Sequence, residues 1–273
     1  MGNVTAAPRT VSPLHSQIQE QTRNLDWTLA HFTFVANVTA LTEECDIAHS
    51  PAMSVASCPG AYDTLQATMA SPQPALAFVG DAPDLLANYA AFLADPGSDV
   101  ALLVNEAQRA IVAEAFTVLE VTPEWQMVYI DDATDLETDP AVELTPEDWP
   151  MMQALAKAEK TVIRTFAKDP FEHGPAFGVW DKKNLVGMMT TNVRVPGAAK
   201  IGNLVIRKGY QDRGYDACII GALVRALQAE NICPFIIIEQ EREEMIARLK
   251  HLGFKQQRPM YLMHCRLEDE TVS

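Results

Sequence analysis

The hydrophobic positions of this chain change period along its length, and the changes mark out its elements. Between residues 74 and 124, short apolar runs alternate with amphipathic stretches. They predict strands at 75–79 and 100–104 and helices at 84–94 and 106–116. An alternation of this kind is typical of a small α/β unit. Before it, the pattern predicts a polar-faced helix at 17–30 and a β-like piece at 32–35.

A second set of elements begins at residue 126. The run 126–130 predicts a strand, and the acid-rich segment that follows predicts a solvated connection ending in a helix start at 145–148. The remaining pattern predicts a β-hairpin at 176–180 and 185–191, strands at 200–206, 234–239 and 260–266, and helices at 215–230 and 241–252. We therefore divide the chain into an N-terminal α/β domain, residues 1–124, and a second domain, residues 125–267.

The composition is that of a folded protein, and the distribution of charge limits which kinds of ligand we expect it to bind. The chain has 273 residues, of which 48% are hydrophobic, and its formal net charge is −15. The charge is uneven: residues 1–124 hold three bases against fourteen acids, whereas residues 151–267 hold eighteen bases against eleven acids. We therefore expect no binding to nucleic acid or to a membrane surface, and any anionic ligand to bind the last 120 or so residues.

The sequence also indicates where the protein is expected to be located and whether it is expected to bind a metal. Membrane spans need roughly 18 to 20 apolar residues, and the chain has no such run and no cationic, apolar start. Its five cysteines are odd in number and scattered, which favours reduced thiols in a cytoplasmic protein. Cys45, His49 and Cys58 lack the spacing of a zinc site, so we expect no metal.

The segment 201–217 carries the clearest chemical signal. A predicted strand turns through Gly209 and Gly214 directly into a predicted helix. Such a turn points backbone N–H groups and the positive end of a helix dipole at one spot, which suits a phosphate or pyrophosphate. Arg207, Lys208 and Arg213 add positive charge beside it. The alternative is an ordinary strand-to-helix turn in which Gly214 only relieves strain. A Walker A loop is excluded, because it requires Lys and Ser or Thr directly after its last glycine.

The order of elements over about residues 126–267 resembles the GNAT superfamily of acyl-CoA-dependent N-acyltransferases. The segment 211–216, Gln-Asp-Arg-Gly-Tyr-Asp, is similar to that family's pyrophosphate motif, and 251–254, His-Leu-Gly-Phe, is similar to the usual end of its last helix. The resemblance implies an α/β (α+β) fold with a mixed, splayed sheet flanked by helices, preceded here by the smaller α/β domain. Whether residues 1–124 are a degenerate GNAT-like unit stays open.

The resemblance also implies ligands and roles. Acetyl-CoA or another acyl-CoA would be the co-substrate, with main-chain groups of Leu204, Val205 and Ile206 bonding its pantetheine arm. A primary amine, on a small molecule or a peptide, would attack the thioester directly, so no cysteine nucleophile is implied and Cys218 is expected in the core. A homodimer stays open. The pyrophosphate would bind to the turn residues Gln211, Asp212, Arg213, Gly214, Tyr215 and Asp216.

Two positions depart from the family pattern. Asp216 stands in place of the motif's last Gly or Ala, and Leu249 stands where many members have a tyrosine that protonates the thiolate. A carboxylate about 5 Å from a phosphate charge repels it by roughly 3 kcal/mol at an effective dielectric constant near 20. We expect Arg213 or Lys208 to offset this repulsion, or Asp216 to face away and complement the helix dipole.

The departures leave the proton transfers and the activity itself open. Glu239, at the end of a predicted buried strand, is our candidate general base, because partial burial would raise its pKa; the alternative is a solvated strand-end acid. The acid falls to Tyr261, Tyr210, Tyr215 or water. His173 is expected in a solvated turn. The rival function is a catalytically inactive relative that binds acyl-CoA or a protein partner.

Overall fold

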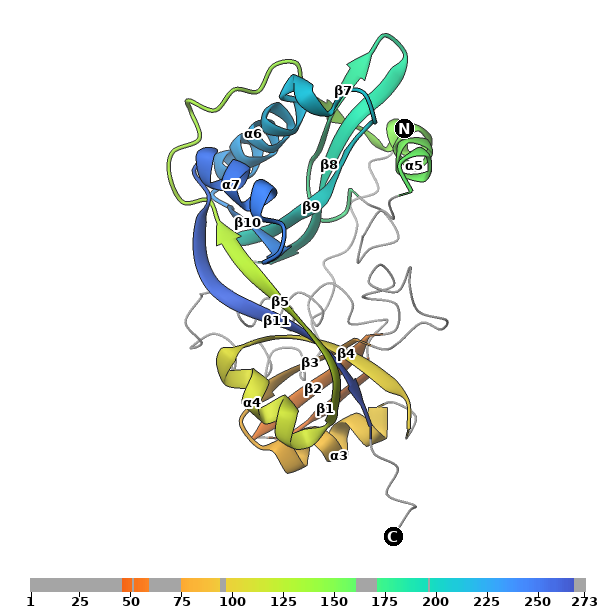
Figure 1. The fold of residues 1–273 in the computed structure, drawn as a ribbon, viewed down its shortest axis with the longest axis vertical. Helices are drawn as coiled ribbons and strands as arrows, with labels where there is room; N and C mark the ends of the chain where they lie inside the picture. Colours follow the sequence, from red (N-terminus) through yellow and green to blue (C-terminus); the bar gives the residue numbers. More distant parts are fainter. Residues whose placement is uncertain are drawn as a thin grey trace, which may run out of the picture.

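One eleven-stranded sheet runs through the chain in the order β1-β2-β3-β4-β11-β5-β10-β9-β8-β7-β6 (Figure 1). This computed structural model describes residues 46–50, 52–58, 75–93, 97–160, 171–195 and 197–267. The predicted elements at 17–30 and 32–35 lie outside the described residues. None of the helices within the described ranges is long and apolar enough to span a membrane.

From β3 to α4 the N-terminal half of the sheet forms as the apolar pattern predicts, whereas strands β1 and β2 were not predicted. Its helix α4 begins with a capping box, in which the Asn105 side chain accepts from the Gln108 N–H at 2.9 Å and the Gln108 side chain accepts from the Asn105 N–H at 3.2 Å. The elements of this half are β1 (Asp46–His49), β2 (Met53–Cys58), β3 (Ala75–Gly80), α3 (Pro83–Leu93), β4 (Asp99–Asn105) and α4 (Glu106–Ala115).

The C-terminal half also confirms the elements predicted from periodicity. A single 3-10 turn, Gln211–Arg213, separates its third strand from the long helix that follows. The elements of this half are β7 (Ala176–Asp181), β8 (Asn184–Val195), β9 (Ala198–Ile206), α6 (Tyr215–Ala229), β10 (Cys233–Glu239) and α7 (Glu243–His251).

Two long strands join the halves. β5 (Thr117–Val128) and β11 (Lys255–Arg266) pair with each other along most of their length and run from the upper to the lower part of the molecule in Figure 1. Each also pairs with a strand of the opposite half: β5 with β10, and β11 with β4. The point between residues 124 and 125 at which we divided the chain therefore lies within β5.

The two halves repeat one topology. Each contains two strands in antiparallel pairing, followed by a strand, a helix, a strand parallel to the previous one, a second helix and a long last strand. In each half the parallel pair is brief, covering two register pairs in β3·β4 and three in β9·β10. The strands then separate toward their carboxyl ends, so each half has a splayed sheet.

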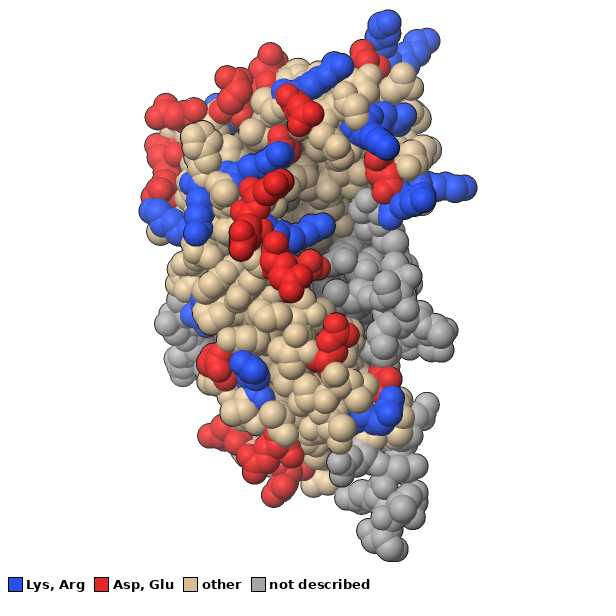
Figure 2. Space-filling model, viewed as in Figure 1, with Lys and Arg blue, Asp and Glu red and all other residues tan. Residues whose placement is uncertain are grey.

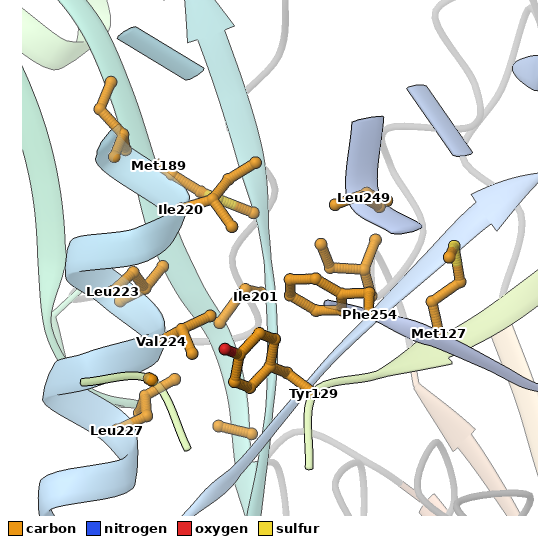
Figure 3. Close-up of a cluster of buried hydrophobic side chains, with 14 of the residues drawn as sticks. Met127, Tyr129, Met189, Ile201, Ile220, Leu223, Val224, Leu227, Leu249 and Phe254 are labelled. Atoms are coloured by element: carbon orange, nitrogen blue, oxygen red, sulfur yellow. The ribbon is translucent and has the colours of Figure 1, made fainter. Parts of the chain in front are cut away.

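Separate hydrophobic cores lie against the two halves. In the C-terminal core, side chains from α6 and α7 pack onto the sheet (Figure 3), and the rings of Tyr129 and Phe254 meet edge to face with centroids 5.3 Å apart. The N-terminal core lies between β2–β4, the end of β11, and helices α3 and α4. Because β11 contributes Met263 and Cys265 to the N-terminal core, the last strand of the chain stabilises the first half.

The acid-rich connection is less solvated than predicted. Ala133 is buried in the C-terminal core, and its N–H donates to the Gln228 side chain at 3.1 Å. At Gly221 of α6 an added Cβ would lie 2.5 Å from the carbonyl oxygen of Glu137, so the absence of a side chain lets this segment approach the helix. A short strand, β6 (Val142–Leu144), follows, and the predicted helix start leads through a 3-10 turn into α5 (Trp149–Ala158).

Candidate functional site

The turn between β9 and α6 has the backbone that its glycines predict. Gly209 and Gly214 both adopt positive φ, at 89° and 72°. A Cβ at either position would meet nothing within 4 Å, so the requirement for glycine comes from the backbone conformation and not from crowding. Gly214 is the N-cap residue of α6, and its lack of a side chain leaves open space directly before the helix.

The first turn of α6 offers N–H groups that the helix does not use. Gly214 provides no side-chain cap, and the first helical bond runs from the Cys218 N–H to the Gly214 carbonyl at 3.2 Å. The N–H groups of residues 215–217 therefore have no acceptor within the helix. Together with the helix dipole they favour an anion at this end.

A cavity of about 480 Å³ lies directly in front of this turn. The wall on the α6 side contains Gln211, Asp212, Gly214, Asp216, Ala217 and Ile220. The opposite wall comes from the last two turns of α7 and consists of Ala247, Arg248, His251 and Leu252. Four of the six predicted pyrophosphate residues therefore line one cavity, whereas Arg213 and Tyr215 do not.

The carboxylate of Asp216 is neutralised by a residue that we did not predict. Arg248 Nη1 lies 2.9 Å from Asp216 Oδ2, across the cavity from α7 to α6. The prediction that Arg213 or Lys208 would offset this charge was wrong for Arg213, whose guanidinium lies over the Tyr210 ring at 4.4 Å from the centroid. The alternative that Asp216 faces away is wrong as well, because Asp216 lines the cavity.

Figure 2 shows how the charges are distributed over one face of the molecule. Lys and Arg side chains gather mainly on the C-terminal half, at the top of the view, where acids are interspersed among them, and the lower half shows few bases. This agrees with the charges counted from the sequence and places the cavity in the more basic half.

The splay between β9 and β10 exposes a strand edge beside the turn. The parallel pairing of the two strands ends at Lys200 and Phe235. Leu204, Val205 and Ile206 lie beyond that point, and Val205 and Ile206 pair on their other edge with β8. Within the described residues, the edge that faces β10 has no strand partner here. An extended ligand arm is able to use such an edge as an added strand would.

Glu239 ends β10 but is not partly buried as predicted. Its side chain is 49% exposed, and its nearest cation is Arg242, with Nε 3.8 Å from Oε2. In the sheet register Glu239 stands opposite Glu124 of β5, which is only 9% exposed. Paired residues share a sheet face, so the two side chains project from the same face of the sheet. Sequence analysis missed Glu124, because only strand pairing across 115 residues brings it to Glu239.

Tyr261 lies on the other face of the sheet. Met260 pairs with Glu124, so Tyr261, the next residue, points to the opposite face from Glu239. The guanidinium of Arg109 lies 4.6 Å above its ring centroid, and a hydrogen bond with Glu106 raises the pKa of the Tyr261 hydroxyl. The structure therefore does not bring our candidate acid and base together.

The remaining tyrosines and the cysteine are engaged elsewhere. Tyr210 donates a hydrogen bond to Asp181 at 2.6 Å, and this bond raises the pKa of its hydroxyl. The ring of Tyr215 stacks on that of Tyr210, with centroids 6.3 Å apart. Leu249 is buried in the core. Burial raises the pKa of the Cys218 thiol, which confirms Cys218 as a core residue.

His173 was wrongly predicted to be solvated. It is only 5% exposed, and its Nε2 has no hydrogen-bond partner among the residues the structure describes. Burial lowers the pKa of its imidazole. No group of three or more His, Cys, Asp or Glu residues within the described ranges is arranged to hold a metal ion.

Comparisons with known proteins show which folds this architecture is similar to. No protein-family model and no curated protein sequence matches the chain. Among solved structures, a protein assigned as an acetyltransferase of the GNAT family from Novosphingobium aromaticivorans superimposes with a TM-score of 0.64 at 22% identity, covering 88% of this chain and 98% of that one.

Two further solved structures agree. A GCN5-related N-acetyltransferase from Kribbella flavida matches with a TM-score of 0.60 at 11% identity, over 87% of this chain and 96% of that one. A tandem GNAT protein from the clavulanic acid biosynthesis pathway matches with a TM-score of 0.60 at 10% identity, over 87% of this chain and 88% of that one. With the splayed sheet and the glycine turn, these likenesses show that this chain has a GNAT superfamily fold.

Proposed function

We propose that this protein transfers an acyl group, most simply acetyl, from an acyl-CoA to a primary amine. The observation that carries the proposal is the uncapped first turn of α6 at Gly214, which faces an open cavity of about 480 Å³. Had the protein's own side chains capped those N–H groups or filled the hollow, no place for a diphosphate would remain. The GNAT fold supports the same interpretation, as does the edge of β9, which beyond Lys200 has no strand partner among the described residues on the side of β10.

The residues of the site fit an acyl-CoA in its two polar regions. In the proposed complex, amides of the segment 211–216 donate to the pyrophosphate, and main-chain groups of Leu204, Val205 and Ile206 bond the pantetheine arm. This arm then lies in the splay, with its thioester toward the end of β10. None of these contacts uses a metal ion.

The proposed reaction is a direct displacement. The amine nitrogen forms a bond to the acyl carbon, the carbon–sulfur bond breaks, and the sulfur leaves with the electron pair. Glu239 accepts the proton that the nitrogen loses. Tyr261 points to the opposite face of the sheet from Glu239, Tyr210 donates to Asp181, and Tyr215 stacks on Tyr210. We therefore assign water as the proton donor to the thiolate. The acids Glu239 and Glu124, which project from the same face of the sheet, favour an acceptor that carries positive charge, as does the acidic N-terminal half; the nitrogen that attacks is a neutral amine.

We also propose that the N-terminal half is a degenerate GNAT-like unit. The repeated order of elements and the second splay support this interpretation. Its role in the reaction would be to supply β5, and with it Glu124, to the site in the other half.

An activity measurement tests the proposal. Thiol release from acetyl-CoA is followed with polyamines and other basic amines as acceptors, in the wild type and in Ala217→Phe, which places a ring into the cavity. Ala229→Phe, exposed at the other end of α6, is the matched control. We expect turnover in the wild type and the control and none in Ala217→Phe. Coenzyme A binding without turnover for any amine would favour the inactive relative, and neither binding nor turnover would remove the proposal.

A further inference from the structure

The Asp216–Arg248 pair connects the two walls of the cavity. Asp216 lies in the first turn of α6 with its side chain 12% exposed, and Arg248 lies on α7 with its side chain 52% exposed. Both line the same hollow as Gly214. The exposed partner of the pair is therefore the cation, and it stands at the edge of the space in front of the uncapped N–H groups.

Arg248 has donors to spare in this position. A guanidinium carries five N–H donors in a planar fork, and it bonds carboxylates and phosphates with the same geometry. The structure records one side-chain bond for Arg248, from Nη1 to Asp216 Oδ2 at 2.9 Å. One edge of the group is thus held by the carboxylate, while another edge is available to a ligand.

The charge balance of the cavity singles out the same residue. Among the described lining residues, Arg248 alone carries a permanent positive charge, whereas Asp212 and Asp216 are acids. Arg213, the cation nearest in sequence to Asp216, lies over the Tyr210 ring instead. Without Arg248, the carboxylate of Asp216 would face a phosphate at the uncapped helix end with no cation paired to it.

We propose that Arg248 binds a phosphate group of the acyl-CoA and that Asp216 is a positioning residue that holds its guanidinium in the cavity. This inference rests on the proposed function. On this interpretation the departure from the motif at Asp216 helps ligand binding. The acid that replaces a small residue of the motif holds in place a cation from a different helix. The rival interpretation is that the pair only clamps α6 to α7.

Calorimetric titration with coenzyme A separates the two interpretations. We expect Arg248→Gln to weaken binding by about 10-fold or more, since a charge-assisted bond is lost and Asp216 is left uncompensated. Lys250→Gln, which removes an exposed charge from the same helix, should change affinity by less than about twofold. Arg248→Lys, which keeps the charge but loses the fork, should lie between the wild type and Arg248→Gln.

The double variant tests the positioning role. With Arg248 gone, Asp216 only repels the ligand, so Asp216→Asn/Arg248→Gln should bind more tightly than Arg248→Gln alone. A simple clamp predicts instead that Asp216→Asn, Arg248→Gln and the double variant lower the melting temperature equally and leave affinity at the level of Lys250→Gln. That pattern would overturn the inference, and a double variant no tighter than Arg248→Gln would overturn the part assigned to Asp216.

A dephosphorylated ligand identifies which phosphate is bound. If Arg248 binds the 3′-phosphate, the wild type and Arg248→Gln should have equal affinity for 3′-dephospho-coenzyme A. If it binds the pyrophosphate, the variant should be weaker for both ligands. A wild type that binds neither ligand would count against the proposed function itself, whereas normal binding in Arg248→Gln would count only against the inference about Arg248.

Discussion

The two halves of the molecule have the same succession of strands and helices, the same brief parallel pairing and the same splay, yet the turns that lead into their first helices differ. In the C-terminal half, β9 leads through Gly209 and Gly214 into α6, whose first turn has three N–H groups without an acceptor in the helix and contributes Asp216 and Ala217 to the lining of a cavity. In the N-terminal half, β3 leads through Asp81 and Ala82 into α3, which begins at Pro83. Both helices carry an acid at their second position, Asp84 in α3 and Asp216 in α6, but proline has no N–H. The first turn of α3 therefore offers an anion one donor fewer than its counterpart.

The splays differ in the same direction. The edge of β9 that faces β10 has no described strand partner beyond Lys200. In the N-terminal half, the buried side chain of Gln108 donates from α4 to the Phe78 carbonyl of β3 at 3.1 Å. A group of the protein itself thus bonds the strand edge that a pantetheine arm would need. The comparison teaches that the repeated topology supplies two splays, while a few local residues decide which one is open to a ligand.

β5 and β11, the last strands of the two halves, each pair with a strand of the other half. The two halves should therefore unfold as one unit. Leu86 in the N-terminal core and Leu223 in the C-terminal core are both fully buried. We expect Leu86→Ala and Leu223→Ala each to cost about 2–5 kcal/mol of unfolding free energy. Urea denaturation followed by circular dichroism should show one transition that both variants shift. Two transitions, each moved by only one variant, would contradict the shared sheet.

The chemical step should depend on the end of β10. We expect Glu239→Gln to lower kcat roughly 100-fold, since a general base is lost, and to leave coenzyme A affinity unchanged. Glu241→Gln is the control, because Glu241 is an exposed acid just beyond the same strand. Steady-state thiol release measures both. Equal rates in the two variants would show that Glu239 is a solvated strand-end acid and not the general base.

Gln108 should matter for stability and not for ligand binding. Gln108→Ala leaves the buried carbonyl of Phe78 without this donor and removes one half of the α4 capping box. We expect a loss of about 1–3 kcal/mol in chemical denaturation and an unchanged coenzyme A titration. If coenzyme A affinity changed in this variant, the N-terminal splay would be involved in binding and the contrast between the halves would fail.

The smallest expected effect is the pH dependence that His173 contributes. Burial lowers the pKa of its imidazole below the usual value of 6.5, so the unfolded chain binds protons more tightly than the folded one. Its contribution to the unfolding free energy should therefore fall as the pH decreases through about 6.5, by no more than about 1.4 kcal/mol per pH unit. Thermal melts of the wild type and His173→Gln between pH 7.5 and 5.5 should differ in slope. Parallel slopes would refute this assignment.

Local patterns predicted most of the elements but not how the halves are joined. The predicted strand at 126–130 covers only the end of β5, because the earlier residues 117–124 mix polar and apolar positions and include Pro123. The start of β11, Lys-Gln-Gln-Arg-Pro, is likewise polar. Residues 117–124 become a strand because they pair with 260–266 of β11, and the start of β11 becomes one because it pairs with 125–128 of β5. This is a tertiary effect that local propensity does not record.

The candidate site was predictable where it is local in sequence. The glycine turn is encoded in the segment 201–217, and five of its residues line the cavity. Arg248 was missed, because helix packing brings it to Asp216 from 32 residues away. Tyr261 was misplaced for a related reason: its side chain faces α4, and the face that a strand residue presents depends on pairing and bulges that the pattern does not fix.

The number of coenzyme A molecules bound per chain tests the central claim, which is that one of two similar splays is open. Titration calorimetry of the wild type should give one site per chain, and that site should disappear in Ala217→Phe and persist in Ala229→Phe. Absence of heat in the wild type, a second site, or undiminished binding in Ala217→Phe would each contradict the assignment of the ligand to the turn at Gly214.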